Sequence, residues 1–589
     1  MISWGFSFLV GVHEGEGSPA VPGADLREQP WPPVDPQDDV VVRTEGASSQ
    51  RDAGKLETTI IRPTLVGTPS DVFEWALITE FGEVEGDGAA WTVVEGEFTP
   101  AGPVPPVGSV RGGGQPEFTT TSNEYGFSDI DWTSATLELN WDVWGGTLTN
   151  IFGWKEVEQA SVTDVDGTYL PAFLARGNTD QDQISNELRF ATTFNDTWDM
   201  TVGFYFLTQE QSYRESRFID INTGTLLPEP GFRRIALGGD MDTDTLGVFM
   251  NNDFQIAEDW ILTAGLRWSD EEKKANIIEE DAGTFCTDVD SFNCTFVRRE
   301  GSWDNWTPKL GVQWQYNDSS QAYALWTKGF RAGGFNFRNA KPGDPNATFP
   351  DPAAVPFAYP AGPTEEEEQT TYEIGLKTQA YDDRLRMNFA YFYNEIDDIQ
   401  RELNQGDLDV IVLQATVNAG DARIKGVEAE FTAVPLDQMT LFGSVGYLDG
   451  KYTRIDSGLG QNITACATFP NCPPIVGSEL PRLARWSFSV GGNYDFPLDG
   501  NGTIRVATDY GYRDPNFYDD SNLQLFDRQH RWNASVSWFS PEDAWTVSVV
   551  GKNLRDEANY GNLTSIAGLY TAGPMQKGRE YGLQIEYRH

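Results

Sequence analysis

The sequence predicts a large all-β fold, an antiparallel transmembrane β-barrel, and three observations support this prediction. Tight turns rich in Asp, Gly and Asn recur along the chain and alternate with connections that are several times longer. The segments between them alternate apolar and polar residues over long stretches. Short turns at one end of every hairpin and long loops at the other are typical of outer-membrane barrels, whose turns face the periplasm and whose loops face the exterior.

The turns and the two terminal segments together predict about 20 strands. The nine tight turns fall at Thr68–Asp71, Gly145–Gly146, Asn195–Asp196, Glu258–Asp259, Asn317–Asp318, Asp382–Asp383, Leu436–Asp437, Leu498–Gly502 and Pro541–Asp543. The longer connections include Arg217–Asp240, Ala275–Gly301, Phe337–Thr364 and Thr453–Leu480. Nine hairpins supply eighteen strands, Arg579–His589 adds a last one, and the apolar segment Ser3–His13 adds a first one.

Alternation with period two predicts strands whose two faces differ. Thr136–Val143 places Leu, Trp and Val at odd positions and Thr, Glu, Asn and Asp at even positions. Arg384–Asn394 alternates in the same way except at Phe392, and Tyr581–Arg588 repeats the pattern. A water-soluble β-sandwich with its apolar residues turned inward would show the same alternation, so periodicity alone leaves both architectures open.

Strand length and tryptophan placement favour the barrel. Trp198–Gln211 and Trp260–Lys273 exceed the ~9–11 residues that cross a bilayer at the usual tilt, and they greatly exceed a typical globular strand of ~5–6 residues. Tryptophans lie close to several short turns, where a girdle at the inner membrane interface is expected: Trp144, Trp198, Trp260, Trp538 and Trp545.

Composition excludes several other classes of protein. No run of about 20 apolar residues is present, which excludes a helical membrane span. A formal net charge of −47 excludes a nucleic-acid partner, which would need clustered Lys and Arg. Acidic runs such as Glu365–Glu368 are interpreted as solvated loops. Met1–Val12 lacks the basic start and cleavage site of a signal peptide and is interpreted as a strand.

Cysteines and histidines give little support to catalysis or metal binding. Two local cysteine pairs, Cys286 with Cys294 and Cys466 with Cys472, predict disulfides inside loops that face an oxidising compartment. The histidines are His13, His530 and His589, too few for a catalytic triad or a histidine-rich metal site. Asp164–Gly167 begins like a calcium loop but places Gly at the fourth rather than the sixth position. We therefore expect no enzyme activity, no cofactor and no metal site.

Seven different stretches are informative together, through their order and spacing, in the part of the chain after about Lys55. They are Gln183–Ala191 (QISNELRFA), Thr263–Lys274 (TAGLRWSDEEKK), Tyr323–Asn336 (YALWTKGFRAGGFN), Tyr372–Gln400 (YEIGLKTQAYDDRLRMNFAYFYNEIDDIQ), Asn418–Glu430 (NAGDARIKGVEAE), Lys552–Glu557 (KNLRDE) and Gly578–Arg588 (GREYGLQIEYR). In sequence, order and spacing they resemble the C-terminal barrel of TonB-dependent outer-membrane receptors.

The resemblance implies an integral barrel of the bacterial outer membrane that takes up a scarce ligand: a ferric siderophore, cobalamin or a glycan. Family barrels have 22 strands and an N-terminal plug, which the TonB complex displaces. Residues 1–589 are expected to form the barrel domain, with a first strand and a long outer loop in residues 1–54 and no plug. By this reasoning the chain is an incomplete copy that lacks the plug and the first two barrel strands.

The implied partners are outer-membrane lipid and lipopolysaccharide, the TonB complex, and a small molecule such as an iron–siderophore. Arg267, Arg331 and Arg338 are the candidate ligand contacts in the lumen and loops. Two other functions stay open at this stage. One is a passive outer-membrane porin, and the other is a secreted acidic β-rich carbohydrate-binding protein.

Overall fold

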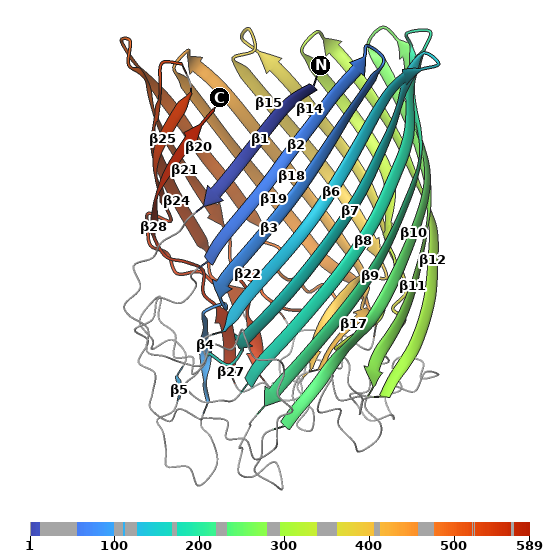
Figure 1. The fold of residues 1–589 in the computed structure, drawn as a ribbon, viewed down its shortest axis with the longest axis vertical. Helices are drawn as coiled ribbons and strands as arrows, with labels where there is room; N and C mark the ends of the chain where they lie inside the picture. The colour runs from blue at the N-terminus through green and yellow to red at the C-terminus, as the bar shows by residue number, and fades with distance from the viewer. Residues whose placement is uncertain are drawn as a thin grey trace.

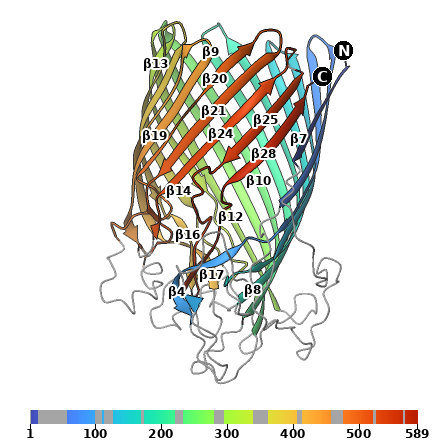
Figure 2. The same cartoon turned by 90° about the vertical axis from the view of Figure 1, so that its left-hand side faces the viewer.

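The protein folds into one large curved sheet of 20 strands, with three small sheets at one end (Figures 1 and 2). The computed structural model describes residues 2–11, 56–98, 110–111, 126–167, 173–219, 233–279, 295–338, 362–405, 413–456, 476–520, 522, 525–542, 544–566 and 570–588. All of the assigned elements are β-strands. Within these ranges no helix is long and apolar enough to span a membrane.

The large sheet contains β1 (Ile2–Gly11), β2 (Leu56–Ser70), β3 (Phe73–Asp87), β6 (Phe127–Val143), β7 (Gly146–Asp164), β8 (Phe173–Phe194), β9 (Trp198–Ile219), β10 (Arg233–Ala257), β11 (Trp260–Glu279), β12 (Thr295–Asn317), β13 (Ser320–Arg331), β14 (Glu367–Ala380), β15 (Leu385–Asp397), β18 (Gly420–Leu436), β19 (Met439–Ile455), β20 (Trp486–Leu498), β21 (Gly502–Arg513), β24 (Gln529–Phe539), β25 (Trp545–Lys552) and β28 (Glu580–Tyr587). The small sheets contain β16 (Gln400–Gln405) and β17 (Leu413–Asn418); β22 (Asn516–Phe517) and β23 (Leu525–Phe526); and β4 (Trp91–Phe98), β5 (Val110–Arg111), β26 (Thr564–Ile566) and β27 (Tyr570–Pro574).

The 20 strands pair antiparallel in chain order, as the turn count predicted. Each predicted tight turn falls between two strands that pair as a hairpin, and these hairpins gather at one end of the barrel (Figure 1); Asp543 in the last turn lies outside the described residues. Trp144 and Gly145 both have positive φ (58° and 78°), the conformation of a two-residue turn whose twist matches that of the flanking strands. The predicted first strand is also present, because β1 pairs with β2 along its whole length.

The apolar face of the wall is its exposed face, and this decides between the barrel and the sandwich. Val536 of β24 and its cross-strand partner Val549 of β25 are 50% and 57% exposed. On the other face of the same two strands, Ser537 and Ser548 are hydrogen-bonded to each other at 2.8 Å. A water-soluble sandwich would bury the valines, whereas a membrane barrel turns them to lipid and keeps polar groups in the lumen.

Lumen-facing aromatic rings lie over glycines on the neighbouring strand. Phe392, the residue that broke the alternation in its segment, lies opposite Gly426, and a Cβ added there would be 2.6 Å from the ring. Trp132 covers Gly82 in the same way and donates its Nε1–H to Glu80 at 2.6 Å. Each glycine leaves the room that the opposite ring occupies, a known device for filling the space beside glycine in strands.

Several strands continue further toward the loop end than predicted. The segment expected to end at Gln211 reaches Ile219, and the one expected to end at Lys273 reaches Glu279. The connections expected to span Arg217–Asp240 and Ala275–Gly301 are correspondingly shorter, since β10 and β12 begin at Arg233 and Thr295. Backbone pairing persists here after the apolar alternation has ended, so the periodicity alone placed these boundaries wrongly.

The aromatic residues near the short turns are exposed or half-buried, and they pack against one another. Trp260 and Trp314 lie opposite each other with ring centroids 5.6 Å apart, and Trp198 stacks on Phe254 at the same distance. Trp545 lies 4.6 Å from the Tyr587 ring. The four cysteines and the predicted first outer loop lie outside the described residues, as do His13 and His589.

Candidate functional site

Arg267 on β11 points into the lumen. Of the three predicted arginines, it is the one whose positive charge is most available to a ligand. Its guanidinium lies 5.7 Å from the ring centroids of both Tyr205 and Phe249, and its Nε donates to Ser269 at 2.8 Å. A Cβ at Gly247 would be 2.5 Å from this guanidinium, so the glycine provides its space. Among the described residues no carboxylate lies in salt-bridge contact with Arg267. The arrangement presents a fixed, stacked cation on the lumen wall.

Arg338 lies at the loop end, where it is held by a network of polar groups. Its guanidinium contacts the Tyr213 hydroxyl at 2.8 Å, a Glu215 carboxylate oxygen at 3.1 Å and the Gln414 amide oxygen at 3.1 Å. Burial works against the charged guanidinium, but Glu215 and Tyr213 outweigh it and raise the pKa of Arg338. Glu215 also accepts a bond from Arg217 at 2.6 Å, and both are buried. We name Tyr213, Glu215, Arg217, Arg338 and Gln414 the upper brace.

Arg331 has a different role, because it anchors the start of the β16–β17 hairpin. It donates to Glu367 at 2.9 Å and to the backbone oxygen of Gln400 at 3.1 Å. The same Glu367 oxygen accepts the Gln400 N–H at 2.6 Å. The three predicted arginines are thus not brought together into one site: Arg267 lies on the lumen wall, while Arg331 and Arg338 hold the elements at the loop end.

A second ion pair, which is only partly buried, fixes the same hairpin through β16. Arg401 on β16 contacts Asp520 with Nε at 3.2 and 3.3 Å and with one terminal nitrogen at 3.1 Å. Asp520 also accepts the hydroxyl of Tyr452, a residue only 1% exposed on β19. A bidentate Arg–carboxylate pair of this kind is strong and geometrically specific. We name Arg401, Asp520 and Tyr452 the lower brace.

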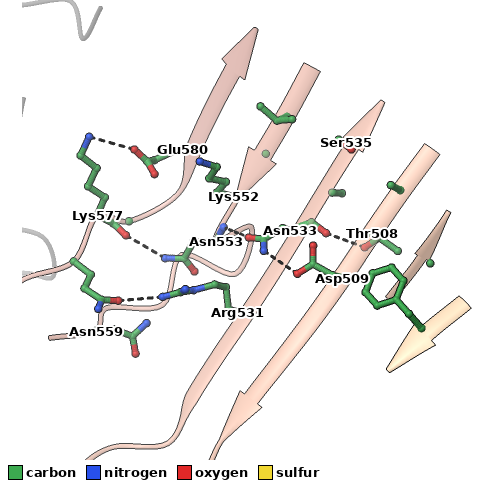
Figure 3. Close-up of a pocket in the computed structure, with 18 residues that line it drawn as sticks. Thr508, Asp509, Arg531, Asn533, Ser535, Lys552, Asn553, Asn559, Lys577 and Glu580 are labelled. Atoms are coloured by element: carbon green, nitrogen blue, oxygen red, sulfur yellow. Dashed lines mark hydrogen bonds and ion pairs between the residues drawn. The ribbon is translucent and has the colours of Figure 1, made fainter. Parts of the chain in front are cut away.

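A recess opens in the wall beside the last strands, with a volume of about 600 Å³ (Figure 3). Its principal polar side chains are Asp509, Arg531, Asn533, Lys552, Lys577 and Glu580. Those on β24 have the opposite parity to the exposed Trp532 and Val536, so they face the lumen. We name this feature the wall recess.

The two carboxylates of the Asp164–Gly167 segment hydrogen-bond to nearby backbone. The Asp164 carboxylate accepts the N–H of Gly167 at 3.2 Å, and Asp166 accepts the N–H of Phe173 at 2.7 Å. Both carboxylates therefore cap local backbone, as Asp side chains commonly do in turns. In the described part of the chain no group of three or more His, Cys, Asp or Glu side chains is placed to hold a metal ion.

Sequence reasoning missed the hairpin and both braces. The hairpin is docked by Asn336, whose side chain accepts the Thr416 N–H at 2.7 Å and donates to the Thr416 oxygen at 3.2 Å. Asn336 lies in the stretch FRAGGFN, which was noted only for its resemblance. Its Gly–Gly step was the available signal, because a Cβ at Gly333 would be 1.9 Å from the Thr364 oxygen.

A wall that is apolar outside and polar inside, with short turns at one end and ordered polar elements at the other, defines an integral outer-membrane β-barrel. The chain belongs to the family described as TonB dependent receptor-like, beta-barrel, whose model matches residues 85–554. Members of this family are transport receptors that reside in the bacterial outer membrane.

Curated relatives and solved structures agree with this assignment. The ferric-pyoverdine M114 receptor PbuA of Pseudomonas sp. (strain M114) is 23% identical over 44% of this chain and 27% of its own length. The metal-pseudopaline receptor CntO of Pseudomonas aeruginosa is 24% identical over 46% of this chain and 30% of its own. The chain therefore matches about a third or less of the length of these relatives.

Two solved structures share the fold. The ferric yersiniabactin uptake receptor FyuA of Yersinia pestis aligns with a TM-score of 0.67 at 16% identity, over 92% of this chain and 72% of that chain. The siderophore receptor PiuA of Acinetobacter baumannii aligns with a TM-score of 0.67 at 15% identity, over 92% and 76%.

Proposed function

We propose that this chain forms the barrel of a receptor that takes up a metal chelate of the siderophore type across the outer membrane, with energy supplied through TonB. Family membership and the names of the relatives, which receive ferric or other metal chelates, support the proposal. The apolar outer face is expected to contact outer-membrane lipid, including lipopolysaccharide.

The observation that carries the proposal is the ordered assembly at the loop end. The β16–β17 hairpin is held by Arg331, by Asn336 and by both braces, and it lies at the end opposite the short turns (Figures 1 and 2). Such a preorganised polar layer presents fixed donors and acceptors to a chelate, and preorganisation lowers the free-energy cost of binding.

Uptake in the native organism tests this function. Cells that carry or lack the gene would be given ⁵⁵Fe that had been loaded into the supernatant of an iron-starved culture. We expect the gene to support uptake that stops when a protonophore collapses the proton gradient. Uptake that is unaffected by the protonophore would instead indicate passive diffusion, and equal uptake without the gene would refute a transport role for these chelates.

Arg267 gives this proposal a residue-level test. We expect Arg267→Gln to raise the half-saturation concentration for uptake about tenfold, the usual effect of losing one charge-assisted hydrogen bond. Arg189→Gln is the matched control, because Arg189 also faces the lumen but is paired with Glu187 at 3.3 Å. We expect the control to change the half-saturation concentration less than about twofold. If the two substitutions change the half-saturation concentration equally, Arg267 does not contact the ligand.

A further inference from the structure

The wall recess carries local charge of the opposite sign to that of the chain. The formal net charge of the chain is −47. Among the described residues that line the recess there are three cations, Arg531, Lys552 and Lys577, and two carboxylates, Asp509 and Glu580. A locally positive recess inside an acidic barrel favours anions at that point.

Two of the three cations keep donors for a bound molecule. Lys577 is paired with Glu580 at 3.4 Å. Among the residues that the structure describes, Arg531 donates only to the neutral amide oxygen of Gln576, at 3.2 Å, and Lys552 makes no ion pair. The free N–H groups of a guanidinium and an ammonium match the oxygens of a carboxylate.

The framework of the recess is preformed by two asparagines. Asn533 donates to Asp509 at 2.9 Å and accepts the backbone N–H of Asn553 at 3.0 Å (Figure 3). Asn553 is 8% exposed and has a φ of 47°, a conformation that Asn tolerates better than most residues. Its side chain closes the turn by donating to the Glu557 oxygen at 2.9 Å and accepting the Glu557 N–H at 3.1 Å.

The far edge of this turn is fixed by a second clamp. Asp556 accepts the backbone N–H of Arg579 at 2.8 Å and its guanidinium at 3.1 Å. Both hydrogen bonds lower the pKa of the Asp556 carboxyl, and the bond from the backbone N–H has the larger effect. The carboxyl is therefore ionised at neutral pH and holds the clamp. The side chains of the recess are therefore positioned before any molecule enters.

We propose that the wall recess binds a small anionic ligand through its carboxylate groups, such as the acid arms of a metal chelate. The inference rests on the proposed function for the identity of the cargo. Arg531 and Lys552 hold the carboxylates, Asp509 accepts from a hydroxyl or amide of the same molecule, and the Phe442 ring covers its carbon skeleton. A volume of about 600 Å³ lies within the range of small-molecule sites.

Binding of a simple tricarboxylate tests the proposal on the purified full-length protein in detergent. Tricarballylate would be titrated by saturation-transfer NMR, with its uncharged triamide as the control molecule. We expect binding of the acid and not of the triamide, and a Kd about tenfold weaker in Lys552→Gln and in Arg531→Gln. Lys425→Gln is the control variant, since Lys425 lies outside the recess and is paired with Asp449 at 3.4 Å. Its Kd is expected to stay within about twofold.

Each outcome bears on one proposal. If no tricarballylate binds up to about 10 mM, or if all variants have equal Kd values, the recess is not a carboxylate site. An absence of binding because a segment of the protein fills the recess would count against the proposal in the same way. Retained mobility of the unheated variants on gels shows that they are folded. Weakened binding in the two recess variants, together with no energised ⁵⁵Fe uptake by the wild type, would support the recess and refute only the transport function.

Discussion

Removing the charge of Asp520 provides a quantitative test of the lower brace. Asp520→Asn keeps the size of the side chain but leaves Arg401 without its carboxylate, while Arg401 stays 28% exposed and Asp520 11%. Breaking a fully buried pair costs ~3–5 kcal/mol. Because water still reaches part of the Arg401 guanidinium, we expect a local cost of about 2–3 kcal/mol.

Hydrogen exchange measures this cost directly. A loss of about 2–3 kcal/mol in local opening free energy corresponds to ~30–150-fold faster exchange. We expect this acceleration in the amides of β16 and β17 and not in β20 and β21. Asp495→Asn is the matched control, because Asp495 makes a bidentate pair with Arg505 at 2.6 and 2.8 Å on those two strands. Two results would refute a stabilising role of the lower brace. One is unchanged exchange of the β16 and β17 amides in Asp520→Asn, and the other is an equal acceleration of those same amides in Asp495→Asn.

Two further substitutions test the wall. Gly82→Ala places a Cβ 1.9 Å from the Trp132 ring and should displace this ring from Glu80. We expect a cost of ~1–3 kcal/mol in unfolding free energy. The heat-modifiable shift of the protein on gels would measure this loss of stability. Gly329→Ala, with no heavy atom within 4 Å, is the control, and equal losses would exclude the packing explanation. Trp314→Ala removes the stack on Trp260 and should lower the melting temperature in detergent, whereas Trp314→Phe should largely preserve it; identical melting temperatures would contradict a stabilising stack.

The features that repeat along the chain were predictable from its sequence. Turn residues such as Gly145 and Asn195 adopt positive φ, so their positions identify the hairpins, and the nine hairpins together with the two terminal segments gave the 20 strands. Alternation assigned the two faces, because lipid and lumen make opposite demands on neighbouring residues. Which face is outward was not predictable from period two alone, and the exposure of Val536 and Val549 decides it.

The loop-end site was not predictable because it depends on contacts between distant segments. Arg401 and Asp520 are 119 residues apart, and Arg217 and Gln414 are 197 apart. Neither pair belongs to a periodic pattern, and in a chain with 89 acidic residues no single carboxylate stands out. The wall recess was missed for the same reason, since its side chains come from separate strands that meet only in the folded sheet.

The central claim is that this sheet crosses the outer membrane with its apolar face in lipid and its polar face in the lumen. Nitroxide labels at Val536, Ser537, Ser548 and Val549, in protein reconstituted into lipid vesicles, test it through collisions with oxygen and with a water-soluble nickel chelate. We expect oxygen to dominate at the two valine positions and the nickel chelate to dominate at the two serine positions. The reverse pattern, or no alternation between neighbouring positions, would contradict the account.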